Sequence, residues 1–229
     1  MDTSKLHATL KCFSVEESDY RFQPIIQGYI NDTYLVLGND RPCYILQRIN
    51  HLVFKDIKGL MGNIQMALDL LSDPGYEHIE LVKTLNGKNY CEIRDEGYWR
   101  LISYIDQSYA SDITTDGNIA FEAGRILGKF HQLLKNAPVN DFVDTIPRFH
   151  DLGLRKDQLE KALAEAAPEK LKVAEKAIAF AKATLPKLRE LQQTQLPIRV
   201  CHNDTKLNNI LFSKKNHKAL CLIDLDTLM

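Results

Sequence analysis

Short runs of apolar residues alternate with polar ones over the first hundred positions of the chain, which is the pattern of half-buried β-strands. We expect strands over residues 22–28, 32–37, 43–49, 80–85, 90–94 and 98–105. The dipeptides Asn86-Gly87 and Glu96-Gly97 are typical of the tight turns that join antiparallel strands. The pattern therefore predicts a β-rich region built from hairpins.

Apolar residues recur at spacings of three and four in two longer segments. These spacings place the apolar side chains on one face of a helix, so we expect helices over residues 56–71 and 118–136. Asp116 stands just before the second segment, where its carboxylate can cap the first turn.

The last third of the chain changes character. Residues 156–194 are rich in Ala, Lys, Glu and Leu, which favours helices, and Pro168 and Pro186 are expected to divide this run into about three pieces. The hydropathy pattern therefore predicts an α+β protein with two lobes. A β-rich lobe covers residues 1–105, and a mainly helical lobe covers residues 106–229.

Composition and charge narrow the function classes. The 229 residues include 29 Lys and Arg and 30 Asp and Glu, so the formal net charge is −1. A chain this close to neutral has no overall attraction for nucleic acid or for an anionic membrane. The five cysteines form no CxxC pair, which disfavours a zinc site, and no apolar run reaches the length of a membrane span. We therefore expect a cytoplasmic protein that binds neither nucleic acid nor membrane.

The richest signal lies at the end of the chain. Residues 202–209 read H-x-D-x-K-x-x-N, and an apolar hairpin then leads to Asp224-Leu225-Asp226. Phosphoryl transfer from ATP requires a carboxylate that accepts the proton of the acceptor hydroxyl, hard oxygen ligands for Mg²⁺, and a cation near the transferred phosphate. Asp204 fits the first role, Asn209 and Asp224 the metal roles, and Lys206 the last. His202 is expected to brace the loop.

These motifs resemble the catalytic loop and metal-binding Asp of the protein-kinase-like fold. Asn203 stands where protein kinases have Arg, and Leu225-Asp226 follows the metal Asp in place of Phe-Gly, which resembles the aminoglycoside phosphotransferase family of small-molecule kinases. The helix at residues 122–134 strengthens this resemblance. Residues 44–50, 149–151 and 223–227, together with the 202–209 loop, resemble the N-acetylhexosamine 1-kinase branch of that family most.

The resemblance implies that ATP binds under the β-rich lobe. Residues 28–34 would form the phosphate-covering hairpin, with Gly28, Asn31 and Thr33 near the phosphates. The segment around Tyr104 would be the hinge that reads the adenine through backbone groups.

The third strand should also supply a cation to the α- and β-phosphates. The sequence places either Gln47 or Arg48 there and leaves both open. No Glu occurs in the helix at residues 56–71 to form the ion pair that protein kinases have at this point.

The resemblance also implies an acceptor and a longer chain. The expected acceptor is the anomeric hydroxyl of an N-acetylhexosamine; aminoglycoside, choline and homoserine kinases, and a nucleotide-binding protein without turnover, remain alternatives. Asp226 is open between a second metal or acceptor contact and a turn cap. Members of the family continue well past the metal Asp, so either the C-lobe is truncated, which we expect, or a partner chain covers the helices at 118–136 and 156–194. A chain with these helices uncovered should be poorly stable or should self-associate.

Overall fold

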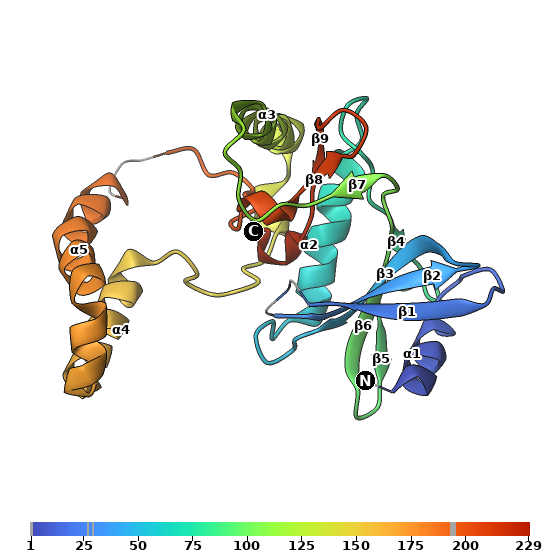
Figure 1. The fold of residues 1–229 in the computed structure, drawn as a ribbon, viewed down its shortest axis with the longest axis horizontal. Helices are drawn as coiled ribbons and strands as arrows, with labels where there is room; N and C mark the ends of the chain where they lie inside the picture. The colour runs from blue at the N-terminus through green and yellow to red at the C-terminus, as the bar shows by residue number, and fades with distance from the viewer. Residues whose placement is uncertain (1, 27, 29, 193–195) are drawn as a thin grey trace. The chain divides into compact units, whose positions relative to one another are not determined.

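The computed structural model describes residues 2–26, 28, 30–192 and 196–229 (Figure 1). The chain divides into two compact units, one formed by residues 1–145 with 199–229 and the other by residues 146–198. The first unit holds both the predicted nucleotide-covering strands and the predicted catalytic loop. The lobe boundary at residue 105 stays a prediction.

An antiparallel sheet forms the N-terminal part of the first unit. Its strands are β1 (Tyr20–Ile25), β2 (Asp32–Gly38), β3 (Arg41–Ile49), β4 (Leu81–Val82), β5 (Cys91–Ile93) and β6 (Gly97–Ser103). They run in the order β1-β2-β3-β6-β4, and β5 pairs with β6. Each of the six predicted strands has a counterpart, although residue 27 of the predicted strand 22–28 lies outside the described residues. Strand β4 is only two residues long because the chain turns at Thr84, whose N–H donates to the Lys88 carbonyl at 2.8 Å.

One face of this sheet is sealed by a helix that the sequence pattern did not predict. Helix α1 (Thr3–Leu10) buries Leu6 and Leu10, which pack with Leu46 and Trp99 of the sheet in one hydrophobic cluster. The helix has only eight residues, too few to show a clear helical period. The polar side chains of Gln47 and Arg100 lie on the opposite face of β3 and β6.

Helix α2 (Ile57–Leu70) matches the prediction for residues 56–71 and begins at Asp56, whose carboxylate accepts the N–H of Gly59 at 2.8 Å. Its buried Asn63 donates to the carbonyls of Val143 and Leu228, at 2.7 and 2.8 Å. An amide on α2 therefore connects the helix to the last residues of the chain, next to the predicted metal Asp.

A second, smaller sheet carries the catalytic loop. Strands β7 (Ser108–Tyr109), β8 (Ile210–Ser213) and β9 (Ala219–Leu222) pair in that order. Helix α3 (Gly117–Leu133) packs on β9 and buries Ile126 and Phe130, and Asp116 caps it through the N–H of Asn118 at 2.8 Å. Short 3₁₀ turns complete the unit: η1 (Leu134–Asn136), η2 (Val139–Asp141), η3 (Leu207–Asn209) and η4 (Leu225–Thr227).

The second unit is a pair of helices, α4 (Leu152–Glu165) and α5 (Pro168–Gln192). The prediction that Pro186 breaks this region is wrong, because α5 continues through it. Pro186 and Lys182 are both exposed, so water can satisfy the Lys182 carbonyl that loses its helical partner. No helix within the described ranges is long and apolar enough to cross a membrane.

Candidate active site

His202 holds the base of the catalytic loop from the protein interior. Its side chain is fully buried, its Nδ1 accepts the N–H of Asp204 at 3.3 Å, and its Nε2 lies 2.8 Å from the Ile223 carbonyl. These contacts suit one neutral tautomer, with the proton on Nε2. Burial lowers the pKa of His202, which favours that uncharged form. The structural role predicted for His202 is therefore confirmed.

A second set of hydrogen bonds joins this loop to the segment after β9. Asn203 adopts a left-handed conformation, with φ of 64°, and its side-chain amide donates to the carbonyls of Cys201 and Thr227 at 3.1 and 3.0 Å. The Thr227 hydroxyl donates to the His202 carbonyl at 2.7 Å. Asn203 therefore connects the catalytic loop to the segment that follows β9.

Asp204 lies at the mouth of this loop with one carboxylate oxygen engaged. Its Oδ2 pairs with Lys206 Nζ at 2.8 Å and accepts the amide of Asn209 at 3.0 Å. Its Oδ1 has no hydrogen-bond partner among the described residues, and about a third of the side chain is exposed. An oriented carboxylate with one open oxygen can accept a proton from a hydroxyl placed beside it.

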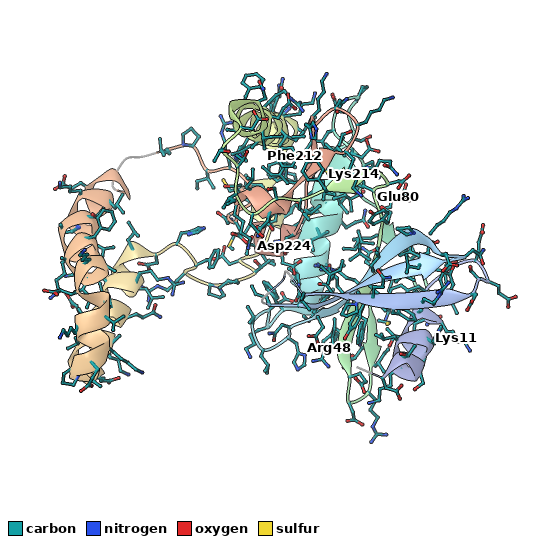
Figure 2. All side chains as sticks on the ribbon, viewed as in Figure 1. Lys11, Arg48, Glu80, Phe212, Lys214 and Asp224 are labelled. Carbon is teal, nitrogen blue, oxygen red and sulfur yellow. The ribbon has the colours of Figure 1, made fainter. Side chains whose placement is uncertain are left out.

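Asn209 and Asp224 are brought together by one backbone hydrogen bond. The N–H of Ile223 donates to the Asn209 carbonyl at 2.8 Å, which places Asp224 next to η3. Asp224 adopts the left-handed region, with φ of 60° and ψ of 57°, just past the end of β9 (Figure 2). Its carboxylate has no hydrogen bond or ion pair within the part of the chain that the structure describes.

The electrostatics of Asp224 are those of a carboxylate that lacks a partner. Although part of the residue reaches the surface, burial by the surrounding protein and the neighbouring Asp226 raise the pKa of Asp224 to about 6, against the smaller opposing effect of Arg100 and Lys206. A divalent cation would relieve this unfavourable charge, because it favours the ionised form.

This donor set suits magnesium. The amide nitrogen of Asn209 is used by Asp204, which leaves its oxygen for a metal, and Asp224 adds a carboxylate. The described residues contain no group of three or more His, Cys, Asp or Glu side chains arranged for a metal. Mg²⁺ commonly binds through one or two protein oxygens, keeping waters and substrate phosphates as its other ligands.

Asp226 contacts a residue that the sequence reasoning missed. Arg100, on β6, forms an ion pair with Asp226 through Nη1, and both side chains are 2% exposed. The second oxygen of Asp226 accepts the amide of Asn31 at 2.6 Å. The available signal was a single charged residue in the middle of an otherwise apolar strand, on the face opposite Trp99 and Leu101.

Three of the residues predicted to bind nucleotide join this network. Gln47 accepts from Arg100 Nε at 2.9 Å and donates to the Thr33 hydroxyl at 3.1 Å. Asn31 accepts the N–H of Asn50 at 3.0 Å, which fixes the turn before β2. The structure thus brings Asn31, Thr33 and Gln47 to one place beside Asp226.

Arg48 is not brought to this place. Successive residues of a strand point to opposite faces, and Arg48 pairs with Asp32 at 2.9 Å on the face away from Gln47. Of the two residues that the sequence left open as the cation of the third strand, the structure therefore favours the Gln47 position, which carries no charge.

Gly28 and Tyr104 have less defined surroundings. A Cβ added to Gly28 would meet only the Asn31 carbonyl oxygen, at 3.8 Å, so the fold does not require glycine there. Tyr104 follows β6, and its N–H donates to the Cys43 carbonyl at 3.0 Å. That N–H is therefore not available to a nucleotide base. If this segment is the hinge, the adenine would have to contact the Tyr104 carbonyl or the backbone of the residues after it.

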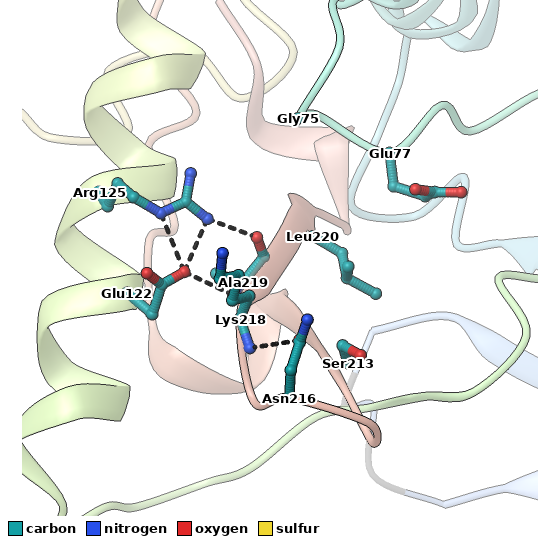
Figure 3. A pocket seen from close by; sticks show the side chains of 9 residues that line it. All are labelled: Gly75, Glu77, Glu122, Arg125, Ser213, Asn216, Lys218, Ala219 and Leu220. Carbon is teal, nitrogen blue, oxygen red and sulfur yellow. Dashed lines mark hydrogen bonds and ion pairs between the residues drawn. The ribbon is translucent and has the colours of Figure 1, made fainter.

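A hollow elsewhere in the same unit contains none of the predicted site residues. It lies between α3 and the β8–β9 hairpin, with a volume of about 380 Å³ (Figure 3). Glu122 accepts from Arg125 at 2.7 Å and from the N–H of Ala219 at 2.9 Å, and Arg125 donates to the Ala219 carbonyl at 2.7 Å. These groups satisfy one another and fasten β9 to α3.

Comparison with known proteins gives one family match and several structural likenesses. The model of the phosphotransferase enzyme family, APH, matches residues 21–229. A spectinomycin phosphotransferase solved in complex with ADP and spectinomycin is 13% identical, with a TM-score of 0.59, and the likeness covers 100% of this chain and 70% of that one.

Two further solved structures show the same fold. An amicoumacin kinase in complex with AMP-PNP, Ca²⁺ and Ami is 16% identical, with a TM-score of 0.64, over 100% of this chain and 65% of that one. A choline kinase from Cryptosporidium parvum Iowa II is 16% identical, with a TM-score of 0.58, over 99% of this chain and 65% of that one. The predicted α+β kinase-like fold is thereby confirmed, and the chain spans about two thirds of the length of these proteins. The N-acetylhexosamine branch is not singled out and stays a prediction.

Proposed function

This chain belongs to the phosphotransferase enzyme family, and we propose that it transfers the γ-phosphoryl group of ATP to a hydroxyl group of a small molecule. The observation that supports this most is the grouping of Asp204, Asn209 and Asp224 by hydrogen bonds at 2.8 to 3.0 Å between the catalytic loop and the end of β9. If these residues only formed turns, the fold would have no need to place Asp204, with one carboxylate oxygen free, near Asp224, whose carboxylate has no partner among the described residues.

Each residue has a distinct role in the proposed reaction. Asp204 orients the acceptor hydroxyl through its open Oδ1 and takes up the proton as the oxygen attacks. Lys206, half exposed beside Asp204, is long and mobile enough to reach the transferred phosphoryl group and offset its charge. Asn209 and Asp224 would hold Mg²⁺, which neutralises phosphate charge when it is bound.

For the acceptor we propose the anomeric hydroxyl of an N-acetylhexosamine. This rests on the sequence resemblance and on charge, since the chain has a net charge of −1 and no dense acidic cluster beyond Asp141 and Asp144 in the segment after α3. A polycationic aminoglycoside would need a strongly acidic pocket, whereas a neutral acetamido sugar needs hydrogen-bonding groups. Aminoglycosides, choline and homoserine remain alternative acceptors.

The test is release of ADP in the presence of Mg²⁺ with a panel of acceptors at equal concentration. The panel contains N-acetylglucosamine, N-acetylgalactosamine, kanamycin, choline and homoserine. We expect the N-acetylhexosamines to stimulate ADP release most. Faster release with kanamycin or choline would contradict the proposed acceptor and leave the phosphotransferase proposal in place. Nucleotide binding without release for any acceptor would support the alternative of a binding protein without turnover.

A further inference from the structure

Arg100 is the most deeply buried cation of the N-terminal sheet. It lies on β6, the central strand that pairs with β3, and only 2% of its side chain is exposed. Removing a guanidinium from water is costly unless its charge is paired and its N–H groups are hydrogen-bonded. Asp226 supplies the opposite charge, and Gln47 accepts from Nε at 2.9 Å.

One nitrogen of this buried group has no protein partner. Among residues 2–26, 28, 30–192 and 196–229, Nη1 bonds to Asp226 and Nε to Gln47, while Nη2 has no hydrogen bond. Arginine presents its donors in a fixed planar fork, so the contacts of Nε and Nη1 also fix the direction of Nη2. The protein therefore holds an oriented, partly unsatisfied cation in an otherwise enclosed place.

The surroundings of Arg100 are those expected of a phosphate site. Gln47, which contacts it, is hydrogen-bonded to Thr33 of β2, and Asp226, its ion-pair partner, binds Asn31 in the turn before β2. Asp226 lies two residues from Asp224, the proposed metal ligand. Arg100 thus stands between the predicted phosphate-covering hairpin and the predicted magnesium site.

The strand register explains why the cation is on β6. Gln47 and Arg100 are direct cross-strand partners in the β3–β6 ladder, so their side chains share one face of the sheet. On the third strand, β3, the position expected to hold a cation is occupied by the uncharged Gln47. The positive charge is carried instead by Arg100, its cross-strand partner on β6. Helix α2 contains no Glu, and its one acidic residue, Asp69, accepts from Gln65 at 2.7 Å, so Asp226 is the carboxylate that pairs with Arg100.

We propose that Arg100 is the cation that this sheet presents to the α- and β-phosphates of the nucleotide, through Nη2, and that Asp226 is its fixed counter-ion rather than a metal ligand. This inference rests on the proposed function, because it assumes that a nucleoside diphosphate or triphosphate binds beside Asp224. Each oxygen of Asp226 already has a partner, Arg100 for one and Asn31 for the other, whereas the Asp224 carboxylate has none among the described residues, so Asp224 is the better candidate ligand for Mg²⁺.

Calorimetric titration with ADP, with Mg²⁺ present, and with adenosine tests the inference. Removing Arg100 alone would leave Asp226 as an unpaired buried charge, so the main variant is the neutral pair Arg100→Gln with Asp226→Asn. We expect it to bind MgADP about tenfold to a hundredfold more weakly than the wild type, the range of a lost charge-assisted contact, while its affinity for adenosine stays within about twofold. Arg94→Gln, which removes a 96% exposed arginine, should bind both ligands as the wild type does.

Two more variants separate a phosphate contact from a structural role. Arg100→Gln combined with Gln47→Lys returns a cation to the facing strand and should recover most of the lost MgADP affinity. Asp226→Asn alone keeps the cation and should retain magnesium-dependent ADP binding, which a metal ligand would not. Thermal melting confirms that each titrated variant is folded.

The outcomes are distinct. Wild-type affinity for MgADP in the folded neutral pair, an equal loss for adenosine and MgADP, or no recovery with Gln47→Lys would overturn the assignment of Arg100. A wild type that binds neither adenosine nor MgADP would instead contradict the proposed function itself, and the assignment of Arg100 with it.

Discussion

The side-chain amide of Asn209 donates to Asp204 twice, to its backbone carbonyl at 2.8 Å and to its carboxylate at 3.0 Å. This pair of bonds closes the loop between the proposed proton acceptor and the proposed metal ligand. The backbone carbonyl of Asn209 in turn accepts the N–H of Ile223, the residue before Asp224. A shift of the catalytic loop would therefore also displace Asp224.

Lys206→Gln is expected to lower turnover about tenfold to a hundredfold with little effect on stability. The ion pair of Lys206 with Asp204 is half exposed, so its loss should change the free energy of unfolding by no more than about 0.5 kcal/mol. The loss of charge near the transferred phosphate should instead appear in kcat. Steady-state kinetics with thermal melting measure both, and Lys214→Gln, in the exposed β8–β9 turn, is the matched control. Unchanged kcat in Lys206→Gln would show that this lysine is a solvated surface charge.

Asp224→Asn is expected to stabilise the metal-free protein while removing its response to Mg²⁺. The pKa of Asp224 is about 6 in the folded state and about 4 in an unfolded chain, so the folded state is penalised once the carboxylate ionises. That penalty is fully present above about pH 6 and disappears as the pH falls toward 4. Asparagine also tolerates the left-handed conformation found here.

Melting curves between pH 4 and pH 8 check this prediction. Asp224→Asn should be more stable than the wild type at pH 8, by about 1 kcal/mol once solvent screening of a partly exposed carboxylate is allowed for, and equal to it near pH 4. With ADP present, Mg²⁺ should raise the melting temperature of the wild type only. A variant less stable than the wild type at pH 8 would show that Asp224 is held by favourable contacts.

His202 is expected to make the fold sensitive to acid. Burial lowers the pKa of His202, so the unfolded state takes up a proton in preference to the folded state once the pH falls below about 6.5. Stability from this residue is therefore present at neutral pH and lost on acidification. His202→Gln should be less stable than the wild type at pH 7.5, by about 1 to 3 kcal/mol for lost buried hydrogen bonds, with a difference that shrinks at pH 5. Urea unfolding at both pH values measures it, and a constant difference would contradict the buried neutral histidine.

Asn63→Leu is expected to loosen the connection between α2 and the end of the chain. The change removes two buried hydrogen bonds to the carbonyls of Val143 and Leu228, and a third from the Val143 N–H at 3.0 Å. The buried carbonyls left without partners should cost about 2 to 4 kcal/mol of unfolding free energy. Lys58→Leu, at an exposed position of the same helix, is the control, and denaturant unfolding compares the two. Equal stability of both variants would show that this connection contributes little.

The sequence pattern was sufficient for most elements of the fold and for the C-terminal motif, because both depend on local signals. Apolar alternation located the strands, and the spacing around Asp116 located α3 and its cap. Helix α1 was not predicted because an eight-residue helix shows barely two turns of period. Pro186 was expected to break a helix, because helix propensity alone does not show that Lys182 is exposed and that its carbonyl can bond to water instead.

Contacts between distant strands could not be read from local pattern. The choice between Gln47 and Arg48 depends on which face of β3 meets β6, and the register of that pair is set by the whole sheet. Arg100 and Asp226 are 126 residues apart, and no spacing rule joins a central strand to a turn at the other end of the chain. The roles of the site residues stay predictions until they are measured.

The most direct test of the phosphotransferase centre is the rate of γ-phosphoryl transfer from radiolabelled ATP to the preferred acceptor in Asp204→Asn, measured beside its affinity for MgADP. Asparagine keeps the size of the side chain and can still contact Asn209, but it cannot take up a proton. The account predicts transfer at least about a hundredfold slower than in the wild type, with MgADP affinity nearly unchanged. Transfer at the wild-type rate by the folded variant would contradict it.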